Sequence, residues 1–424
     1  MKKHVVFLLA LAVLVSLAGC AKSESGGAAA AGPAVIEQWG WNAGEIEKIF
    51  AAYKAATGAD VTLNYQAVQQ QEVFQKLQTV VSAGLDLPDI VPSEIGQRGT
   101  MLGLDIWSDL EKAPFNFDPN TFHKYFNALC RNERGELVCV PWDVTSAGLA
   151  YKRDLAEKYL GTSDPDELMK RFPSWDAFVQ EGTKLQQSTG GKIFMFTGLS
   201  NIYQIASGQN PQPIVKNDRL DMTPVKATLN VVARFRDNKT ADNILGDTPA
   251  YHASFVDDTH IFYPCAGWTP NYQIMPNDPS GPTHIWGLIV PPEGMFSWGG
   301  TGHLIPKDAK NGLEGFKFAS WLISYDGSKW EADNLAFYMT NVELYKDPKY
   351  AKVINPYFGD QDLGVVFYGA IDTINVRPVS VYDVAIQDTF NLVIEQMNSN
   401  RNLTAAQAAE IFETELRNKA SDVQ

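Results

Sequence analysis

The residues of this chain best suited to bind a small polar molecule are tryptophans that stand beside acidic or amide side chains. Trp41 and Asn42 directly follow the first predicted strand, and Trp142 is adjacent to Asp143. An indole ring stacks on the C–H face of a sugar ring, while carboxylates and amides hydrogen-bond its hydroxyl groups. Such pairs are typical of a carbohydrate site. The candidate ligand-contacting residues are Trp39, Trp41, Asn42, Glu94, Trp142, Asp143, Trp268, Trp298 and Gly300.

Each candidate also has a plainer interpretation. Glu94 and Asp143 could cap a helix or remain solvated charges. Tyr203 and Tyr368 are further aromatic side chains that could reach the same site. A tryptophan beside a helical pattern usually packs in a hydrophobic core, and we expect this of Trp107, Trp175, Trp321 and Trp330.

The elements that must position these residues alternate between strands and helices. Short strands are predicted near 35–39, 61–65 and 88–91, with helices between them. Gly58 and Gly84 follow the two helices as stop signals. This order at this spacing favours parallel strand–helix–strand units and therefore an α/β fold. Further helices are expected at 151–159, 174–187, 313–323, 383–397 and 404–418, and residues 255–290 are expected to be rich in strands.

Composition narrows the class of protein. The chain has 424 residues, which is more than one hydrophobic core usually holds, so we expect at least two domains. Its formal net charge of -14, without a clustered basic run after the N-terminus, excludes a nucleic-acid-binding surface. We find no motif for a nucleotide or metal cofactor and predict none.

The N-terminus has the pattern of an export signal. Lys2 and Lys3 precede an apolar run that is too short to span a bilayer. The sequence Leu-Ala-Gly-Cys at 17–20 resembles a bacterial lipobox, which implies cleavage after residue 19 and a lipid on Cys20. Residues 20–34 form a small-residue tether. We therefore expect a membrane lipoprotein facing the periplasm or the exterior; a plain secretory signal is the alternative.

Two cysteines flank a predicted hairpin. Cys130 and Cys139 stand on either side of a segment that contains Gly135. In an oxidising compartment they could form a disulfide, and the alternative is two separate buried thiols. Cys265, in an apolar run, is expected to be a structural free thiol.

Enzymatic readings find little support in the sequence. His252, Asp257, Asp258 and His260 could form a metal cluster, although a solvated loop is the better interpretation. A membrane-anchored glycoside hydrolase would also use tryptophans and carboxylates, but no acidic pair stands out. We therefore expect a protein that is not an enzyme.

Several ordered motifs resemble the extracellular solute-binding proteins of ABC importers, in the family that includes maltose-binding proteins. They are Tyr-Lys-Ala-Ala-Thr-Gly at 53–58, Leu-Pro-Asp-Ile-Val at 87–91, Pro-Ser-Trp-Asp-Ala-Phe at 173–178, Gly-Trp at 267–268 and Gly-Thr-Gly-His-Leu-Ile-Pro at 300–306. The third departs from the family pattern, with Ser for Thr and Ala for Glu.

The resemblance implies a two-lobe periplasmic-binding-protein fold of type II. The first lobe would comprise 35–145 and 290–326, and the second 147–288 and 330–424. Chain crossings would fall near 144–148, 287–292 and 325–331. Trp268 matches a family position that commonly stacks on sugar.

The resemblance also implies a function. We expect a monomer that captures an oligo- or disaccharide in the inter-lobe cleft and delivers it to ABC permease subunits. The same fold could instead bind a polyamine or another small polar solute.

Overall fold

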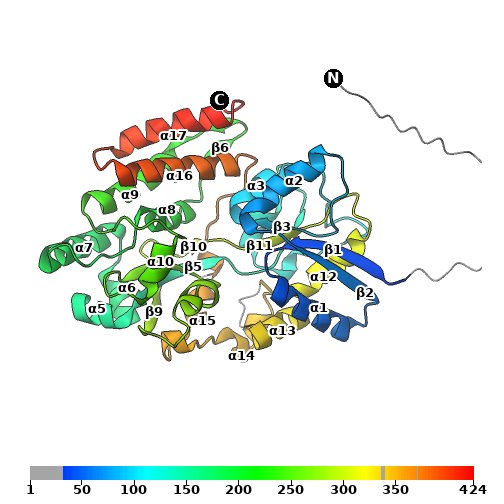
Figure 1. The fold of residues 1–424 in the computed structure, drawn as a ribbon, viewed down its shortest axis with the longest axis horizontal. Coiled ribbons are helices and arrows are strands. Elements are labelled where there is room, and N and C mark those ends of the chain that lie inside the picture. Colours follow the sequence, from blue (N-terminus) through cyan, green and yellow to red (C-terminus); the bar gives the residue numbers. More distant parts are fainter. Residues whose placement is uncertain (1–31, 336–339, 370) are drawn as a thin grey trace, which may run out of the picture.

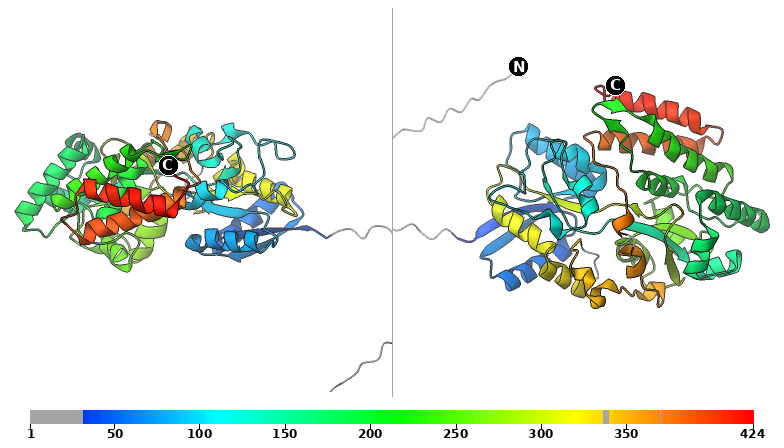
Figure 2. Two further views of the ribbon diagram at one scale, coloured as in Figure 1. Left: turned by 90° about the horizontal axis from the view of Figure 1, so that it is seen from above. Right: turned by 180° about the vertical axis from the view of Figure 1, so that it is seen from behind.

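The computed structural model describes residues 32–335, 340–369 and 371–424 (Figure 1). The predicted signal peptide, Cys20 and the tether up to residue 31 lie outside the described residues. Within them the chain forms two bodies side by side, here called the first and second lobes (Figures 1 and 2).

The first lobe begins with the predicted strand–helix–strand unit. Strand β1 (Ala34–Gly40) pairs in parallel with β2 (Val61–Ala67), and α1 (Ala43–Thr57) connects them. Helix α1 ends at Gly58 in the left-handed conformation. The apolar stripe expected on this helix is buried: Ile46, Ile49, Phe50 and Tyr53. These predictions are confirmed.

Three more strands of the first lobe come from distant parts of the chain. Strand β11 (Thr301–Leu304) lies between β3 (Val91–Glu94) and β4 (Cys139–Pro141) and is antiparallel to both. The observed β3 begins at Val91, later than predicted. This lobe also contains the helices α2 (Val73–Ser82), α3 (Ile95–Leu102), α4 (Asn127–Cys130) and α12 (Gly312–Leu322). Its single hydrophobic core combines residues from two chain segments, 36–142 and 304–323.

The second lobe is built on β5 (Ser146–Lys152). This strand pairs with β8 (Phe262–Ala266), β9 (Trp286–Ile289) and β10 (Phe296–Ser297), all antiparallel. Its side chains alternate between two clusters, with Leu149 in one and Ala150 in the other, so both faces of the sheet are covered. The main helices are α5 (Arg153–Leu160), α6 (Pro165–Arg171), α7 (Trp175–Thr189), α8 (Leu199–Gly208), α9 (Met222–Asp237), α16 (Asp383–Ser399) and α17 (Ala405–Lys419).

The predicted late helices are confirmed, and two of them have the caps expected from sequence. Ser174 accepts a hydrogen bond from the Ala177 amide at the start of α7. Thr404 forms a capping box with Gln407 at the start of α17. The strand-rich expectation for 255–290 is only partly right, because β8 and β9 are separated by helical turns at Pro270–Ile274 and α11 (Met275–Asn277).

The chain passes from the first lobe to the second at 142–145, returns at 298–300, and crosses to the second lobe again between α13 (Tyr325–Leu335) and α16. The second passage was expected at 287–292, and that expectation is wrong because β10 pairs with β5 of the second lobe. The assignment of 330–424 to the second lobe also fails at its start. Helix α13 stays with the first lobe, where Trp330 and Leu335 pack against its core. Among the described residues, no helix combines the length and apolar character needed to span a bilayer.

Candidate ligand-binding cleft

A cleft of about 1590 Å³, its opening to solvent included, lies between the lobes. The first lobe contributes Trp41, Asn42, Glu94 and Asp143 to its lining. The second lobe contributes aromatic side chains on the opposite wall, namely Tyr203, Tyr251, Trp268, Tyr272 and Trp298. Six of the predicted ligand-contacting residues therefore line one cleft.

Strand ends bring these residues together. Trp41 follows β1, Glu94 is the last residue of β3, and Asp143 follows β4 by two positions. Across the cleft, Trp268 follows β8 in the same manner. Side chains that follow strands in α/β proteins commonly meet at one edge of the sheet, which is where ligands bind.

The two carboxylates are anchored by backbone amides. Glu94 Oε2 accepts a 2.7 Å hydrogen bond from the Gly96 amide, so Glu94 does cap a helix, α3, while also lining the cleft. Asp143 Oδ1 accepts a 2.6 Å bond from the Thr301 amide, which ties the first two inter-lobe passages together. Burial raises the pKa of Glu94 and raises that of Asp143 to about 6.

Arg98 fixes the passage at 298–300 to the first lobe. Its Nη2 donates to the carbonyl of Gly300 at 2.7 Å and to that of Ser93 at 3.1 Å. Gly300 has a φ of 101°, and a Cβ at this position would lie 2.1 Å from Cγ2 of Thr145. Gly300 was predicted to contact the ligand, but it is not among the residues that line the cleft. Its role lies in the backbone, because the passage needs a residue without a side chain here.

Two tryptophans form one continuous wall. Trp268 and Trp298 pack edge to face with ring centroids 4.8 Å apart. The Trp268 indole N–H donates to the Trp298 carbonyl at 3.3 Å. This hydrogen bond orients the Trp268 ring, and the edge-to-face contact places the Trp298 ring beside it.

Trp39 and Trp142 do not line the cleft. Both are buried in the first-lobe core and line a small internal cavity there. The Trp142 indole N–H donates at 2.9 Å to Glu331, a fully buried carboxylate on α13. Trp107, Trp175 and Trp321 are buried as predicted. Tyr203 lines the cleft, whereas Tyr368 stacks on Tyr345 elsewhere.

Several cleft residues were not predicted from the sequence. Asn201 and Gln204 extend from α8, and Gln387 and Asn391 from α16. Gln387 and Asn391 are one helical turn apart and hydrogen-bonded at 3.0 Å. A polar pair with this spacing on a helix with a buried apolar face is the signal that could have identified them.

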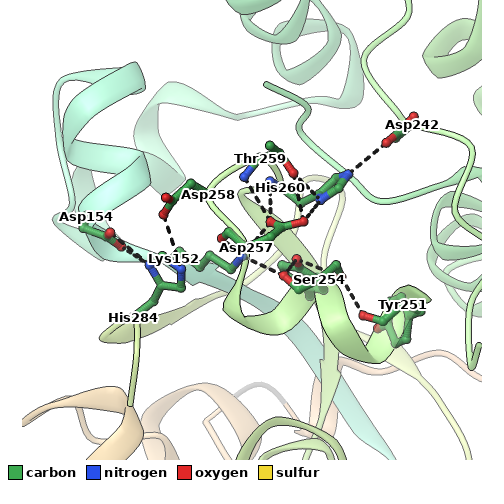
Figure 3. Close-up of polar contacts among 11 residues, drawn as sticks. Lys152, Asp154, Asp242, Tyr251, Ser254, Asp257, Asp258, Thr259, His260 and His284 are labelled. Carbon is green, nitrogen blue, oxygen red and sulfur yellow. Dashed lines mark hydrogen bonds and ion pairs between the residues drawn. The ribbon is translucent and has the colours of Figure 1, made fainter. Parts of the chain in front are cut away.

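The residues considered as a metal cluster do not form one group (Figure 3). Asp258 lies with Asp154 and His284, whose potential ligand atoms are within 4.8 Å of one another, whereas Asp257 and His260 belong to a separate set of ion pairs. Lys152, which has no exposed side-chain surface, pairs with Asp257, and Asp257 accepts a bond from His260 at 2.7 Å. His260 also contacts Asp242 at 3.2 Å. These ion pairs connect the loop before β8 to strand β5. His252 instead pairs with Asp247, at 3.3 Å.

The predicted hairpin between the two cysteines is present, with a bridge between Arg131 and Leu137. Cys130 and Cys139 are buried free thiols in this structure, as is Cys265. The Cys130 thiol is hydrogen-bonded to Cys139.

Residues 48–352 match the sequence profile of the family described as bacterial extracellular solute-binding protein. The chain belongs to this family. No curated protein sequence matches the solute-binding protein.

Solved structures establish the fold of this solute-binding protein. A protein described as extracellular solute-binding protein family 1 superposes with a TM-score of 0.80 at 18% identity, over 92% of this chain and 100% of that one. The sugar-binding protein MalE of Xanthomonas citri gives 0.71 at 14% identity, over 91% and 98%. The galacto-N-biose/lacto-N-biose I-binding protein of a Bifidobacterium longum ABC transporter gives 0.73 at 16%, over 92% and 97%. The expected periplasmic-binding-protein fold is therefore confirmed.

Proposed function

We propose that this solute-binding protein captures an oligo- or disaccharide in the inter-lobe cleft and delivers it to the permease of an ABC importer. The observation that carries the proposal is the pairing of a tryptophan wall, Trp268 and Trp298, with carboxylates and amides on the facing wall. Aromatic faces cover the C–H surface of a sugar, and the polar groups satisfy its hydroxyls. The sugar ligands of MalE and of the Bifidobacterium protein support the same class.

Capture would proceed by closure of the lobes, with the chain passages between them acting as hinges. Gly299 and Gly300 both have positive φ angles, of 74° and 101°, so the return passage uses backbone conformations that few other residues tolerate. A ligand that contacts both walls binds the closed arrangement more tightly and shifts the population toward it. The closed form would then dock on the permease.

Thermal shift and calorimetry against a panel of mono-, di- and oligosaccharides test the proposal, because a bound ligand raises the melting temperature. Trp268→Ala should weaken binding of the best ligand by more than about 1 kcal/mol. Tyr325→Ala, at a position that is 40% exposed on α13, is the matched control and should leave affinity unchanged. An unaltered Kd in Trp268→Ala would remove this residue from the site.

We also propose that lipid on Cys20 holds the protein at the membrane. The lipobox-like sequence before Cys20 supports this, and the following tether would let the lobes reach the permease. The full chain should fractionate with membranes, whereas Cys20→Ser should not be lipidated. Release of both forms into the soluble fraction would argue for a plain secretory signal.

A further inference from the structure

The charged side chains that line the cleft are mainly negative. Glu94, Asp143 and Asp247 are in its lining, and among the described residues no lysine or arginine is. Asp247 is the outermost, with 72% of its side chain exposed and His252 beside it. Glu94 and Asp143 are the carboxylates of the interior.

The protein compensates these two carboxylates only in part, through the charge of Arg98. Within the described ranges, neither forms an ion pair, and each accepts only backbone amides. Arg98 is the nearest cation, but its Nη2 and Nε are occupied by Ser93 and Gly300. One guanidinium therefore stands near two desolvated carboxylates.

Two further carboxyl groups lie near this site, and the raised pKa of one of them, Glu331, favours its uncharged form. Glu331 is fully buried behind Trp142, and Glu45 belongs to the first turn of α1. Both burial and repulsion from Asp143 raise the pKa of Glu331. A buried carboxylate without a counter-ion costs free energy, and an incoming cation recovers that cost.

The aromatic wall suits a cation equally well. Trp41, Trp268 and Trp298 present indole rings to the cleft, and the indole face attracts an ammonium group more strongly than other aromatic rings do. A neutral sugar would satisfy the hydrogen bonds of the carboxylates but would leave their charge only partly compensated. An ammonium group on the sugar satisfies both requirements.

We propose that the ligand is a carbohydrate bearing an amino group, whose ammonium is held by Glu94 and Asp143. This inference rests on the proposed carbohydrate function and narrows it to one chemical class.

Matched pairs of sugars test the inference by calorimetry at pH 7.5. The first two pairs are glucosamine with glucose and galactosamine with galactose. The third pair is the β-1,4-linked disaccharide of glucosamine with its hydroxyl counterpart, cellobiose. N-acetylglucosamine adds the bulk of the substituent without its charge. We expect at least one amino sugar to bind about tenfold or more tighter than its hydroxyl and acetylated counterparts.

Charge-removing variants locate the effect. Asp143→Asn keeps the oxygen that accepts from the Thr301 amide, and Glu94→Gln keeps an acceptor for Gly96. Each should reduce the preference for the amino sugar to within about threefold, because the variant loses the charge that favours the ammonium group. Asp60→Asn, at an exposed first-lobe position outside the cleft, is the control and should keep the full preference.

The outcomes separate this inference from the function on which it rests. Neutral sugars that bind as tightly as their amino counterparts would overturn the inference and leave the carbohydrate function intact. If no sugar of the panel binds, both proposals fail. Binding of spermidine without binding of any sugar would likewise overturn both and indicate a polyamine receptor.

Discussion

The hydroxyl of Tyr272 donates a hydrogen bond to Glu45, with its oxygen 2.9 and 3.0 Å from the two carboxylate oxygens. Glu45 lies in the first turn of α1 in the first lobe, and Tyr272 lies in the helical turn after β8 in the second. This bond joins the lobes directly, at a point outside the chain passages. It can therefore exist only while the lobes are close together.

Removal of this contact should favour the open arrangement. We expect Tyr272→Phe to raise the Kd of the best ligand about three- to tenfold, because a typical hydrogen bond contributes a net of about 0.5–1.5 kcal/mol. The increase should appear mainly as faster dissociation in stopped-flow fluorescence. Tyr325→Phe, at an exposed position that does not line the cleft, is the control. Equal dissociation rates for both variants would mean that the bond does not stabilise closure.

Asp143 should lower the stability of the protein at neutral pH. Its pKa is raised by burial from 3.8 to about 6, so the folded state holds the proton more tightly than the unfolded state. The free energy of unfolding should therefore fall as the pH rises from about 4 to about 6, with no further loss from this group above that range.

Asp143→Asn removes this effect while keeping the bond to Thr301. We expect the variant to exceed the natural protein in stability by about 1–3 kcal/mol at pH 7.5 and to match it near pH 4, in urea unfolding at both pH values. If the variant is less stable than the natural protein at pH 7.5, the charged form of Asp143 does not destabilise the folded state. A substitution that raises the stability of a protein but weakens its ligand binding is typical of a residue that is kept for function.

Cys130 and Cys139 should oxidise after export. Although burial opposes it, the Cys130 thiol and Arg98 lower the pKa of Cys139, which favours the thiolate that attacks in disulfide formation. After denaturation without reductant, only Cys265 should react with a thiol reagent. Reduction should then cost about 2–4 kcal/mol of stability. Reaction of all three thiols would show that the pair stays reduced, and Cys265→Ala provides the control.

Gly300 should be intolerant of a side chain for reasons of position as well as conformation. Gly281 has a similar φ of 111°, yet a Cβ there would meet open space. Gly281→Ala therefore measures backbone strain alone, at about 1–2 kcal/mol. Gly300→Ala should cost on the order of 2 kcal/mol more because of its contact with Thr145.

A second substitution isolates that contact. Thr145→Ser removes Cγ2 but keeps the hydroxyl that bonds Tyr125 and Ser297. In a double-mutant cycle measured by chemical denaturation, Thr145→Ser should recover most of the additional cost of Gly300→Ala. Simple additivity of the two substitutions would mean that the clash is relieved by backbone movement elsewhere.

The local elements were predictable because their signals are local. The stripe of α1 and its stop at Gly58 lie within one helix, and the cap of α17 lies within four residues. Elements whose partners are distant were predicted less well. The two-residue strand β10 carries no pattern of its own, and only its pairing with Ala147 assigns it to the second lobe.

The residues of the site were also predictable where their signals are local and not where they depend on distant contacts. Residues close to predicted strand ends or chain turns were identified from that position: Trp41, Asn42, Glu94, Asp143 and Trp298. Trp268 was identified because it matches a family position. Trp142 is likewise close to a strand end, yet a carboxylate 189 residues away turns it into the core. Tyr272 and Glu45 are separated by 227 residues, and neither carries a local motif. Contacts of this kind arise only when the lobes are assembled.

The edge-to-face pair of Trp268 and Trp298 has a practical consequence. Trp298 is the residue before Gly299, where the return passage begins, so a rotation of the lobes alters the surroundings of both rings. The emission of these indoles should therefore change on closure without any attached dye. The protein therefore contains its own optical sensor, and binding to every variant that keeps both tryptophans can be titrated in ordinary buffer by following this emission.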